Sequence, residues 1–293
     1  MKKITVNAVS PSPYRQKCMT DPTAFDNAPF IPDAAAYPER WSEAAREHRS
    51  IEAALGRARL NQSYGPHPSE KYDLFYPASA QPKGTVIFIH GGFWRAFSRS
   101  DWSHLARGAT ERGWAVAMPS YPLCPEVKIS DITGSIARAT AAIALKTQGK
   151  ISLTGHSAGG HLALRMLDPA LDIGEARSRI TRCLPISPLT DLAPLRDTHL
   201  NDTLQLTDSE AKSESPVHQQ APLTPVHVLI GAAERPSFIA QAKALPWPGV
   251  RVSEAAKLHH FNVIDFLLEA DHPLTQWLTD EGAEPPTRPD PSA

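Results

Sequence analysis

The sequence predicts an α/β fold, in which a mostly parallel sheet is covered by helices on both faces. Short runs of β-branched and aromatic residues alternate along the chain with segments of helical apolar spacing. The run at 85–89 (Thr-Val-Ile-Phe-Ile) is apolar without alternation, which is typical of a strand buried on both faces. Right-handed crossovers through the intervening helices would align such strands in parallel.

The predicted elements follow one another in a regular order. The helix at 129–143 is well defined, because its isoleucines recur at steps of three and four and form one apolar stripe. An earlier helix is expected at 101–112, and Gly113 would end it. Strands are expected at 71–76, 85–89, 114–118, 151–154, 183–186, 226–230 and 250–254, and helices at 101–112, 129–143, 158–167 and 238–245.

A single large domain is expected to hold this pattern. Residues 1–60 are rich in proline, alanine and charge, with helix-forming composition over 39–60, so we predict an N-terminal arm with one helix. Residues 61–281 form the α/β domain. An insertion at about 188–222 lacks a strand pattern and follows a strand's carboxyl end, so we interpret it as a small cap over the ligand site. Residues 282–293 are predicted to be a disordered, proline-rich tail.

Composition narrows the classes of function. Hydrophobic residues make up 41% of the chain and the formal net charge is -1, so neither a nucleic acid nor a membrane is expected as a partner. No stretch approaches the roughly 18 apolar residues of a membrane span, and no signal core follows the first lysines. Three dispersed cysteines form neither a disulfide framework nor a metal pair. We expect a cytoplasmic protein without metal or cofactor.

The pentapeptide Gly155-His156-Ser157-Ala158-Gly159 carries the strongest chemical signal. It directly follows a predicted strand and opens a predicted helix, which is the context of a nucleophile elbow. The tight turn strains the serine backbone and requires small residues two positions before and after it. The pattern therefore predicts Ser157 as a nucleophile; an ordinary serine in a tight turn is the alternative.

The segment 90–94 (His-Gly-Gly-Phe-Trp) follows the buried strand at 85–89. Its glycines would let the backbone approach the nucleophile without a Cβ in the way. We expect the N–H groups of Gly92, Phe93 and Ala158 to surround a developing oxyanion, where one such donor is worth about 3 kcal/mol of barrier. A glycine turn beside a buried histidine is the alternative.

The base and the acid should follow the last strands in the order serine, acid, histidine. His259 and His260 both lie after the strand at 250–254, and either is acceptable from position alone. The elbow would turn the imidazoles of His156 and His161 away from the serine hydroxyl. Glu234 is the carboxylate that follows the strand at 226–230. Asp191 is its rival, one strand earlier.

Several motifs together resemble the kynurenine formamidase (arylformamidase) branch of the α/β hydrolases, which is related to the hormone-sensitive-lipase-like esterases. The resemblance extends from about Tyr64 to Leu274. It is carried by 72–77 (Tyr-Asp-Leu-Phe-Tyr-Pro), 90–95 (His-Gly-Gly-Phe-Trp-Arg), 155–160 (Gly-His-Ser-Ala-Gly-Gly), the insertion from 189 to 216, and 260–264 (His-Phe-Asn-Val-Ile).

The resemblance implies an α/β-hydrolase fold and hydrolysis of an N-formyl aryl amide through an acyl-enzyme. It favours His260 over His259, because the family has His-Phe-Asp-Val-Ile where this chain has 260–264. The family carries an aspartate where this chain has Glu234, a side chain longer by one methylene. The predicted triad is therefore Ser157, Glu234 and His260.

We expect an aromatic small molecule as the substrate. Phe93, Trp94 and Trp102 are candidates for stacking against it, with core packing as the alternative. The predicted pocket residues are His90, Gly91, Trp94 and His156. A carboxylesterase of broad range is the second interpretation of these motifs, and a non-catalytic receptor on the same fold is the third. The oligomeric state, including a homodimer, stays open.

Overall fold

A computed structural model describes residues 21–79 and 81–280 of the 293-residue chain. The predicted sheet is present, with eight strands in the order β1-β2-β4-β3-β5-β6-β7-β8. The pairs β1–β2 and β2–β4 are antiparallel, and every pairing from β4 through β8 is parallel. The strands are β1 (Ala58–Ser63), β2 (Lys71–Phe75), β3 (Gly84–Ile89), β4 (Ala115–Pro119), β5 (Lys150–His156), β6 (Ile180–Ile186), β7 (His227–Gly231) and β8 (Arg251–Ala255).

The central strands separate two apolar layers. In β3, Ile87 and Ile89 belong to one core cluster, whereas Val86 and Phe88 belong to the other. Successive side chains of a strand point to opposite faces, so an uninterrupted apolar run serves both layers. This confirms the prediction made from 85–89.

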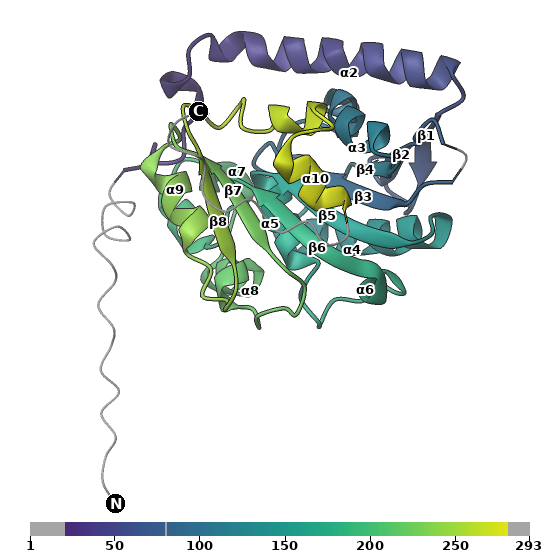
Figure 1. The fold of residues 1–293 in the computed structure, drawn as a ribbon. Helices are drawn as coiled ribbons and strands as arrows, with labels where there is room; N and C mark the ends of the chain where they lie inside the picture. Colours follow the sequence, from purple (N-terminus) through teal and green to yellow (C-terminus); the bar gives the residue numbers. More distant parts are fainter. Residues whose placement is uncertain (1–20, 80, 281–293) are drawn as a thin grey trace, which may run out of the picture.

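Helices cover both faces of the sheet (Figure 1). One layer contains residues of α4 (Ile129–Lys146), α5 (Ala158–Arg165), α6 (Ala176–Arg179) and α9 (Pro236–Lys243). The other contains residues of α2 (Tyr37–Ala54), α3 (Arg107–Glu111) and α10 (Pro273–Thr279). In Figure 1, α2 runs along the outside of this second layer, next to the chain that leads to α10.

Two predicted helices differ from the structure. The helix expected over 39–60 ends at Ala54, and residues 58–63 form strand β1 instead, because they pair with β2 at the sheet edge. The helix expected over 101–112 is divided into the short turns η3 (Arg99–Asp101) and η4 (Ser103–Ala106) followed by α3. Trp102, between the two turns, has φ -125° and ψ 4°, and its indole packs on Trp41 of α2.

The insertion at 188–222 contains no strand, as its sequence pattern predicts. It consists of η5 (Ala193–Asp197), α7 (Asn201–Leu204), α8 (Asp208–Glu214) and η6 (Pro216–His218). The predicted tail at 282–293 and Cys18 lie outside the described residues. Within the described ranges, Cys124 and Cys183 are free thiols, and no helix is long and apolar enough to cross a bilayer.

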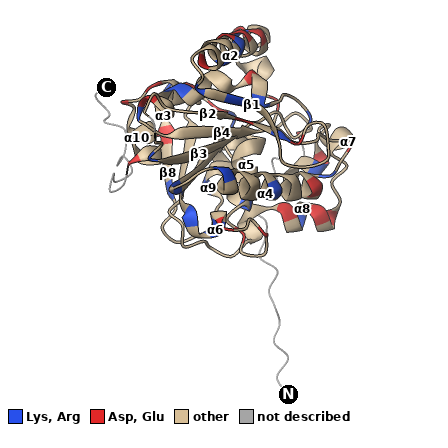
Figure 2. Cartoon of the chain, turned by 90° about the vertical axis from the view of Figure 1, so that its right-hand side faces the viewer, with Lys and Arg blue, Asp and Glu red and all other residues tan. Residues whose placement is uncertain are grey.

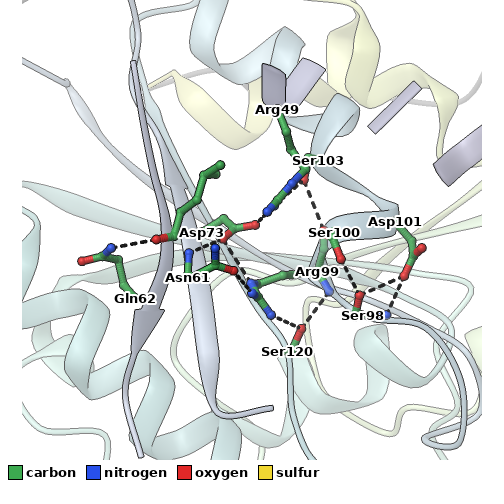
Figure 3. Close-up of polar contacts among 11 residues, drawn as sticks. Arg49, Asn61, Gln62, Asp73, Ser98, Arg99, Ser100, Asp101, Ser103 and Ser120 are labelled. Carbon is green, nitrogen blue, oxygen red and sulfur yellow. Dashed lines mark hydrogen bonds and ion pairs between the residues drawn. The ribbon is translucent and has the colours of Figure 1, made fainter. Parts of the chain in front are cut away.

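A buried ionic cluster fastens α2 to the sheet (Figure 3). The fully buried Asp73 of β2 accepts from Arg49 of α2 and from Nε of Arg99 at 3.1 Å. Its Oδ1 also accepts from the backbone N–H of Asn61 at 2.7 Å. Two guanidinium groups and a main-chain donor thus compensate a carboxylate removed from water, which is the condition for a tolerable buried charge.

The remaining charges of α2 contrast with this cluster. Figure 2 shows acidic and basic residues interspersed along the outer surface of α2. The pair Arg46–Glu43, for example, is separated by 3.7 Å, and both side chains are largely exposed. Exposed pairs of this kind contribute little to stability. The inward-facing Arg49 is therefore the charged residue of α2 that we expect to matter for its position.

Candidate active site

Ser157 occupies a strained turn between β5 and α5. Its backbone has φ 56° and ψ -117°, and its N–H donates to the carbonyl of Ile186 at 2.8 Å. A Cβ on Gly155 would lie 2.3 Å from the carbonyl oxygen of Gly159, and one on Gly159 would lie 2.0 Å from the carbonyl oxygen of Ile89. Real Cβ atoms do not approach backbone so closely, so both glycines are required for this turn, as the pentapeptide predicts.

An imidazole–carboxylate pair lies in the loops after β7 and β8. Nδ1 of His260 is 2.6 Å from Oε2 of Glu234, and both side chains are buried. The other carboxylate oxygen, Oε1, accepts from the hydroxyl of Ser187 at 2.5 Å and from the N–H of Gly231 at 2.9 Å. A carboxylate with both oxygens bound is fixed in place, and so it fixes the ring orientation of His260.

The alternative residues have other contacts. The carboxylate of Asp191 accepts from the N–H of Ala193 at 3.0 Å, and its main chain is bound on both sides by the amide of Gln241. His259 lies 3.3 Å from the hydroxyl of Tyr37 through Nε2. The loop after β6, which contains Asp191, also contains Ser187, and the Ser187 hydroxyl donates a hydrogen bond to Glu234. The sequence analysis did not identify Ser187.

Ser157 and His260 line the same cavity, which has a volume of about 410 Å³. Among the residues described by the structure, none forms a hydrogen bond with the Ser157 hydroxyl. Catalytic hydrogen bonds are often long without substrate and tighten in the Michaelis complex. The arrangement places a free hydroxyl and an oriented imidazole on one surface.

The segment 90–94 passes directly beside the elbow. A Cβ on Gly91 would be 3.3 Å from Cβ of Ser157, and one on Gly92, at φ 112°, would be 2.3 Å from the carbonyl oxygen of Ala96. In the described ranges, no residue accepts a hydrogen bond from the N–H of Gly92, Phe93 or Ala158. These three main-chain donors next to Ser157 are thus available to an oxyanion.

Aromatic side chains dominate the cavity. Trp41, Trp102 and Phe97 are in mutual contact, with the two indole centroids 4.6 Å apart, and Phe261 packs on Trp41 at 5.3 Å. These rings come from three separate segments: α2, the connection between β3 and α3, and the loop after β8. The cavity is also lined by Asp26, Asn27, Ala28, Pro29, Pro38, Phe93, Arg95, His156 and Leu200.

The N-terminal contribution to this cavity was missed by the sequence interpretation. Residues 21–54, which we call the strap, supply Asn27, Pro38 and Trp41 to the lining. The ring of Phe25 meets Phe238 edge-on at 5.6 Å, and Phe238 lies 4.2 Å from the ring of His260. The sequence analysis predicted an N-terminal arm with one helix. The signal that this arm packs on the domain was its aromatic residues, such as Phe25 and Trp41, because an arm surrounded by water does not need them.

Two of the predicted pocket residues lie elsewhere. His90 is buried with its ring stacked on Tyr121 at 4.3 Å, and Trp94 is fully buried with its ring edge-on to His161. Neither is among the described residues that line the cavity, so Trp94 is a core residue rather than a stacking surface. Gly91 lies against the elbow, and His156 lines the cavity.

A larger cavity of about 640 Å³ lies between α2 and the start of α3. Its lining includes His48, Glu52, Arg57, His104 and Arg107, and contains no residue of the predicted triad. Size alone does not identify a reaction site. The smaller cavity is the candidate substrate site, because its lining contains the strained Ser157, His260 and the segment with Gly92 and Phe93 together.

Comparison with known proteins agrees with the observed fold. The family described as alpha/beta hydrolase fold matches residues 86–235, which include the strand–elbow–helix region and Glu234. Curated relatives include kynurenine formamidases. That of Danio rerio is 27% identical over 270 residues, covering 82% of this chain and 92% of its own; that of Salmo salar is 27% identical over 252 residues, covering 80% and 85%.

Solved structures show the same architecture. A candidate thioesterase from Silicibacter sp. tm1040 is 46% identical, with a TM-score of 0.85 over 88% of this chain and 98% of that chain. Esterase B from Lactobacillus rhamnosis is 20% identical, with a TM-score of 0.62 over 84% and 92%. At that identity, the second likeness shows the fold alone.

Proposed function

Because the chain belongs to the alpha/beta hydrolase fold family and is a hydrolase, we propose that it is a serine hydrolase of small aryl formamides and related aryl amides, carbamates and esters. In this proposal, Ser157 is the nucleophile, His260 the base and Glu234 the acid. The observation that carries it is the 2.6 Å contact of Glu234 with Nδ1 of His260, on a cavity that His260 shares with Ser157.

The proposed reaction proceeds in two steps. Oγ of Ser157 attacks the substrate carbonyl while Nε2 of His260 takes the hydroxyl proton. Glu234 holds the N–H at Nδ1 and stabilises the imidazolium. The oxyanion accepts from the N–H groups of Gly92, Phe93 and Ala158. The bond to the leaving nitrogen or oxygen then breaks, and His260 returns the proton to that atom.

Water completes the cycle. It attacks the acyl group on Ser157 as His260 removes one of its protons. The serine ester bond breaks, Oγ regains its proton from His260, and the carboxylic acid is released. With a formamide substrate, the products are formate and a free aryl amine. Apart from the attacking water, the two steps balance with the substrate and the side chains of Ser157 and His260.

The cavity supports an aromatic substrate with a small acyl group. Its volume of about 410 Å³ is near the lower end of the range for small-molecule sites. Trp41, Trp102 and Phe97 form a continuous aromatic surface there, suited to edge-on or offset contact with another ring. The formamidase relatives give the acyl group its expected identity, a formyl.

A carboxylesterase or thioesterase of broad range is the second candidate. It is favoured by the 46% identical structure, which carries a thioesterase description, and it would use the same triad. The two candidates differ in which acyl and leaving groups are turned over fastest, not in the proposed chemistry.

A panel of substrates separates them. We expect kcat/KM for an N-formyl aryl amide such as N-formyl-kynurenine to be within a hundredfold of that for p-nitrophenyl acetate, although an amide is intrinsically far less reactive. A thioester and an alkyl ester complete the panel. Ester or thioester rates more than a hundredfold above the formamide rate would favour the second candidate.

A further inference from the structure

The turn that carries His260 is closed by its own hydrogen bonds. The carbonyl oxygen of His259 accepts from the N–H of Val263 at 3.0 Å and from that of Asn262 at 3.2 Å. The side-chain oxygen of Asn262 accepts from the N–H of His259 at 2.8 Å. Residues 259–263 thus form one compact unit, so a displacement of this turn also displaces the imidazole of His260.

The ring of His259 joins this turn to the strap in a defined tautomer. Its Nδ1 is the acceptor for the N–H of Phe261 at 3.2 Å, because a main-chain N–H can only donate. Burial lowers the pKa of the His259 ring, which favours the neutral form. A neutral ring whose Nδ1 accepts carries its proton on Nε2. Since Nε2 lies 3.3 Å from the hydroxyl oxygen of Tyr37, the His259 N–H donates to Tyr37.

Tyr37 contacts both sequence neighbours of His260. Its ring meets that of His259 edge-on, with the centroids 5.6 Å apart, and that of Phe261 at 5.4 Å. Tyr37 is the first residue of α2, and its ring also packs at 5.4 Å on the buried Trp41, which lies one turn further along the helix. The start of α2 is therefore anchored against the turn that carries the proposed base.

The contacts of the His260 ring fix a different property from those of the turn. Glu234 binds Nδ1 of His260 at 2.6 Å, and Phe238 packs on the ring with the centroids 4.2 Å apart, so both set the orientation of the ring. The position of the main chain depends on the turn. Tyr37 is not one of the described residues that line the candidate substrate cavity. An effect of Tyr37 on the reaction is therefore transmitted through the turn, without contact with the substrate.

We propose that Tyr37 is a positioning residue, which holds the turn at 259–263 so that Nε2 of His260 faces the hydroxyl of Ser157. This inference rests on the proposed function, because it uses the proton transfer by His260. A misplacement of about 1 Å can cost on the order of 100-fold in rate, so a loosened turn should be measurable in kcat. The strap then contributes to the rate of the reaction as well as to the lining of the cavity.

Two single variants and their combination test the inference with 4-nitrophenyl acetate. Tyr37→Phe keeps the ring but removes the hydroxyl that accepts from His259. His259→Asn places an amide oxygen near the position of Nδ1, where it can still accept from Phe261, but it lacks the Nε2–H. We expect kcat to fall about threefold in each variant, since each removes the same hydrogen bond. The double variant should also fall by only about threefold, because the two changes act on one interaction.

The division between kcat and KM separates positioning from substrate contact. In the proposed reaction, His260 moves a proton in both acylation and deacylation, so both rate constants should fall together. KM depends on their ratio and on substrate binding, so it should stay within about twofold of wild type in every variant.

A larger change and a matched control extend the series. Tyr37→Leu also removes the ring contacts with His259 and Phe261, and it should lower kcat about tenfold with KM unchanged. Arg40→Met is the control, because the exposed Arg40 lies over the Tyr37 ring, with its guanidinium carbon 4.6 Å from the centroid. It should change kcat by less than about twofold, since it leaves the contacts with the turn in place.

The outcomes distinguish the inference from the proposed function. Far-UV circular dichroism checks the folding of each variant, and if Tyr37→Leu does not fold, the two single variants and their combination decide. An unchanged kcat in the folded Tyr37 variants, a rise in KM without a fall in kcat, or additive losses in the double variant would overturn the inference and leave the proposed function intact. A folded wild-type protein that does not hydrolyse the ester would overturn both.

Discussion

Two regions with different origins meet at the cavity. The first is the carboxyl edge of the parallel strands β3, β5, β7 and β8, which presents the segment 90–94, Ser157, Glu234 and His260. The second is the strap, residues 21–54, which supplies Asn27 and Trp41 from the far end of the chain. The edge is specified by short motifs at strand ends, whereas the strap is held by contacts between residues distant in sequence.

The difference concerns what each region contributes. The edge provides groups that move protons and stabilise charge, and small displacements there are expected to reduce the rate by orders of magnitude. The strap provides apolar surface and is fastened through Arg49 to Asp73 (Figure 3) and through Phe25 to Phe238. Changes in the strap should alter stability and substrate preference by smaller factors.

The largest effect is expected at the edge. Ser157→Ala removes the proposed nucleophile, so kcat should fall by about 10⁴-fold or more, as in other enzymes that lose this group. Folding should be retained, because an alanine fits the same turn. Turnover by purified protein and far-UV circular dichroism give the two readouts. Activity near wild type would remove Ser157 from the proposed triad.

Replacement of the acid should have the next largest effect. Glu234→Gln keeps the shape of the side chain but loses the charge that holds His260, so kcat/KM should fall by about 10³-fold. Asp191→Asn is the matched control, because Asp191 caps a turn at Ala193, and it should change kcat/KM by less than threefold. The reverse ranking would place the acid one strand earlier.

Stability of the strap should depend on one inward-facing arginine. Arg49→Met removes a buried ion pair to Asp73, and we expect the free energy of unfolding to fall by about 2 kcal/mol. Arg46→Met, on the same helix, removes an exposed pair with Glu43 and should change it by less than about 0.5 kcal/mol. Urea unfolding measures both. Equal losses would mean that the buried cluster does not fasten α2.

The smallest effect is expected on substrate preference. Trp41→Leu removes one ring of the aromatic surface, so kcat/KM for phenyl acetate should fall about fivefold, in line with about 1 kcal/mol for an aromatic contact. For ethyl acetate, which has no ring, it should stay within twofold. A matching fall for both esters would indicate that the strap acts on stability and not on recognition.

The sequence predicted the edge well because its signals are local. A strand buried on both faces, a glycine on each side of Ser157 and a carboxylate after β7 are each visible within a few residues. Parallel strands end at the same edge, so these residues are brought together without knowledge of long-range packing. The geometry of Glu234 with Nδ1 of His260 agrees with that expectation.

The strap could not be predicted in the same way. Nothing near Arg49 in the sequence indicates that Asp73 will bind it, and the pairing of β1 with β2 replaced the helical preference of residues 58–60. Likewise, Trp94 is the last residue of the predicted oxyanion segment, but its side chain lies in the core, and the backbone there has positive φ, 49° at Phe93 and 55° at Trp94. Such outcomes depend on tertiary contacts that outweigh local preference.

The most direct measurement is the site of covalent modification by a fluorophosphonate. The proposed chemistry predicts one equivalent of adduct, found by peptide mass spectrometry on Ser157, abolished in Ser157→Ala and slowed strongly in Glu234→Gln. A folded protein that forms no adduct, or forms it at another residue, would contradict the assignment of Ser157 as the nucleophile.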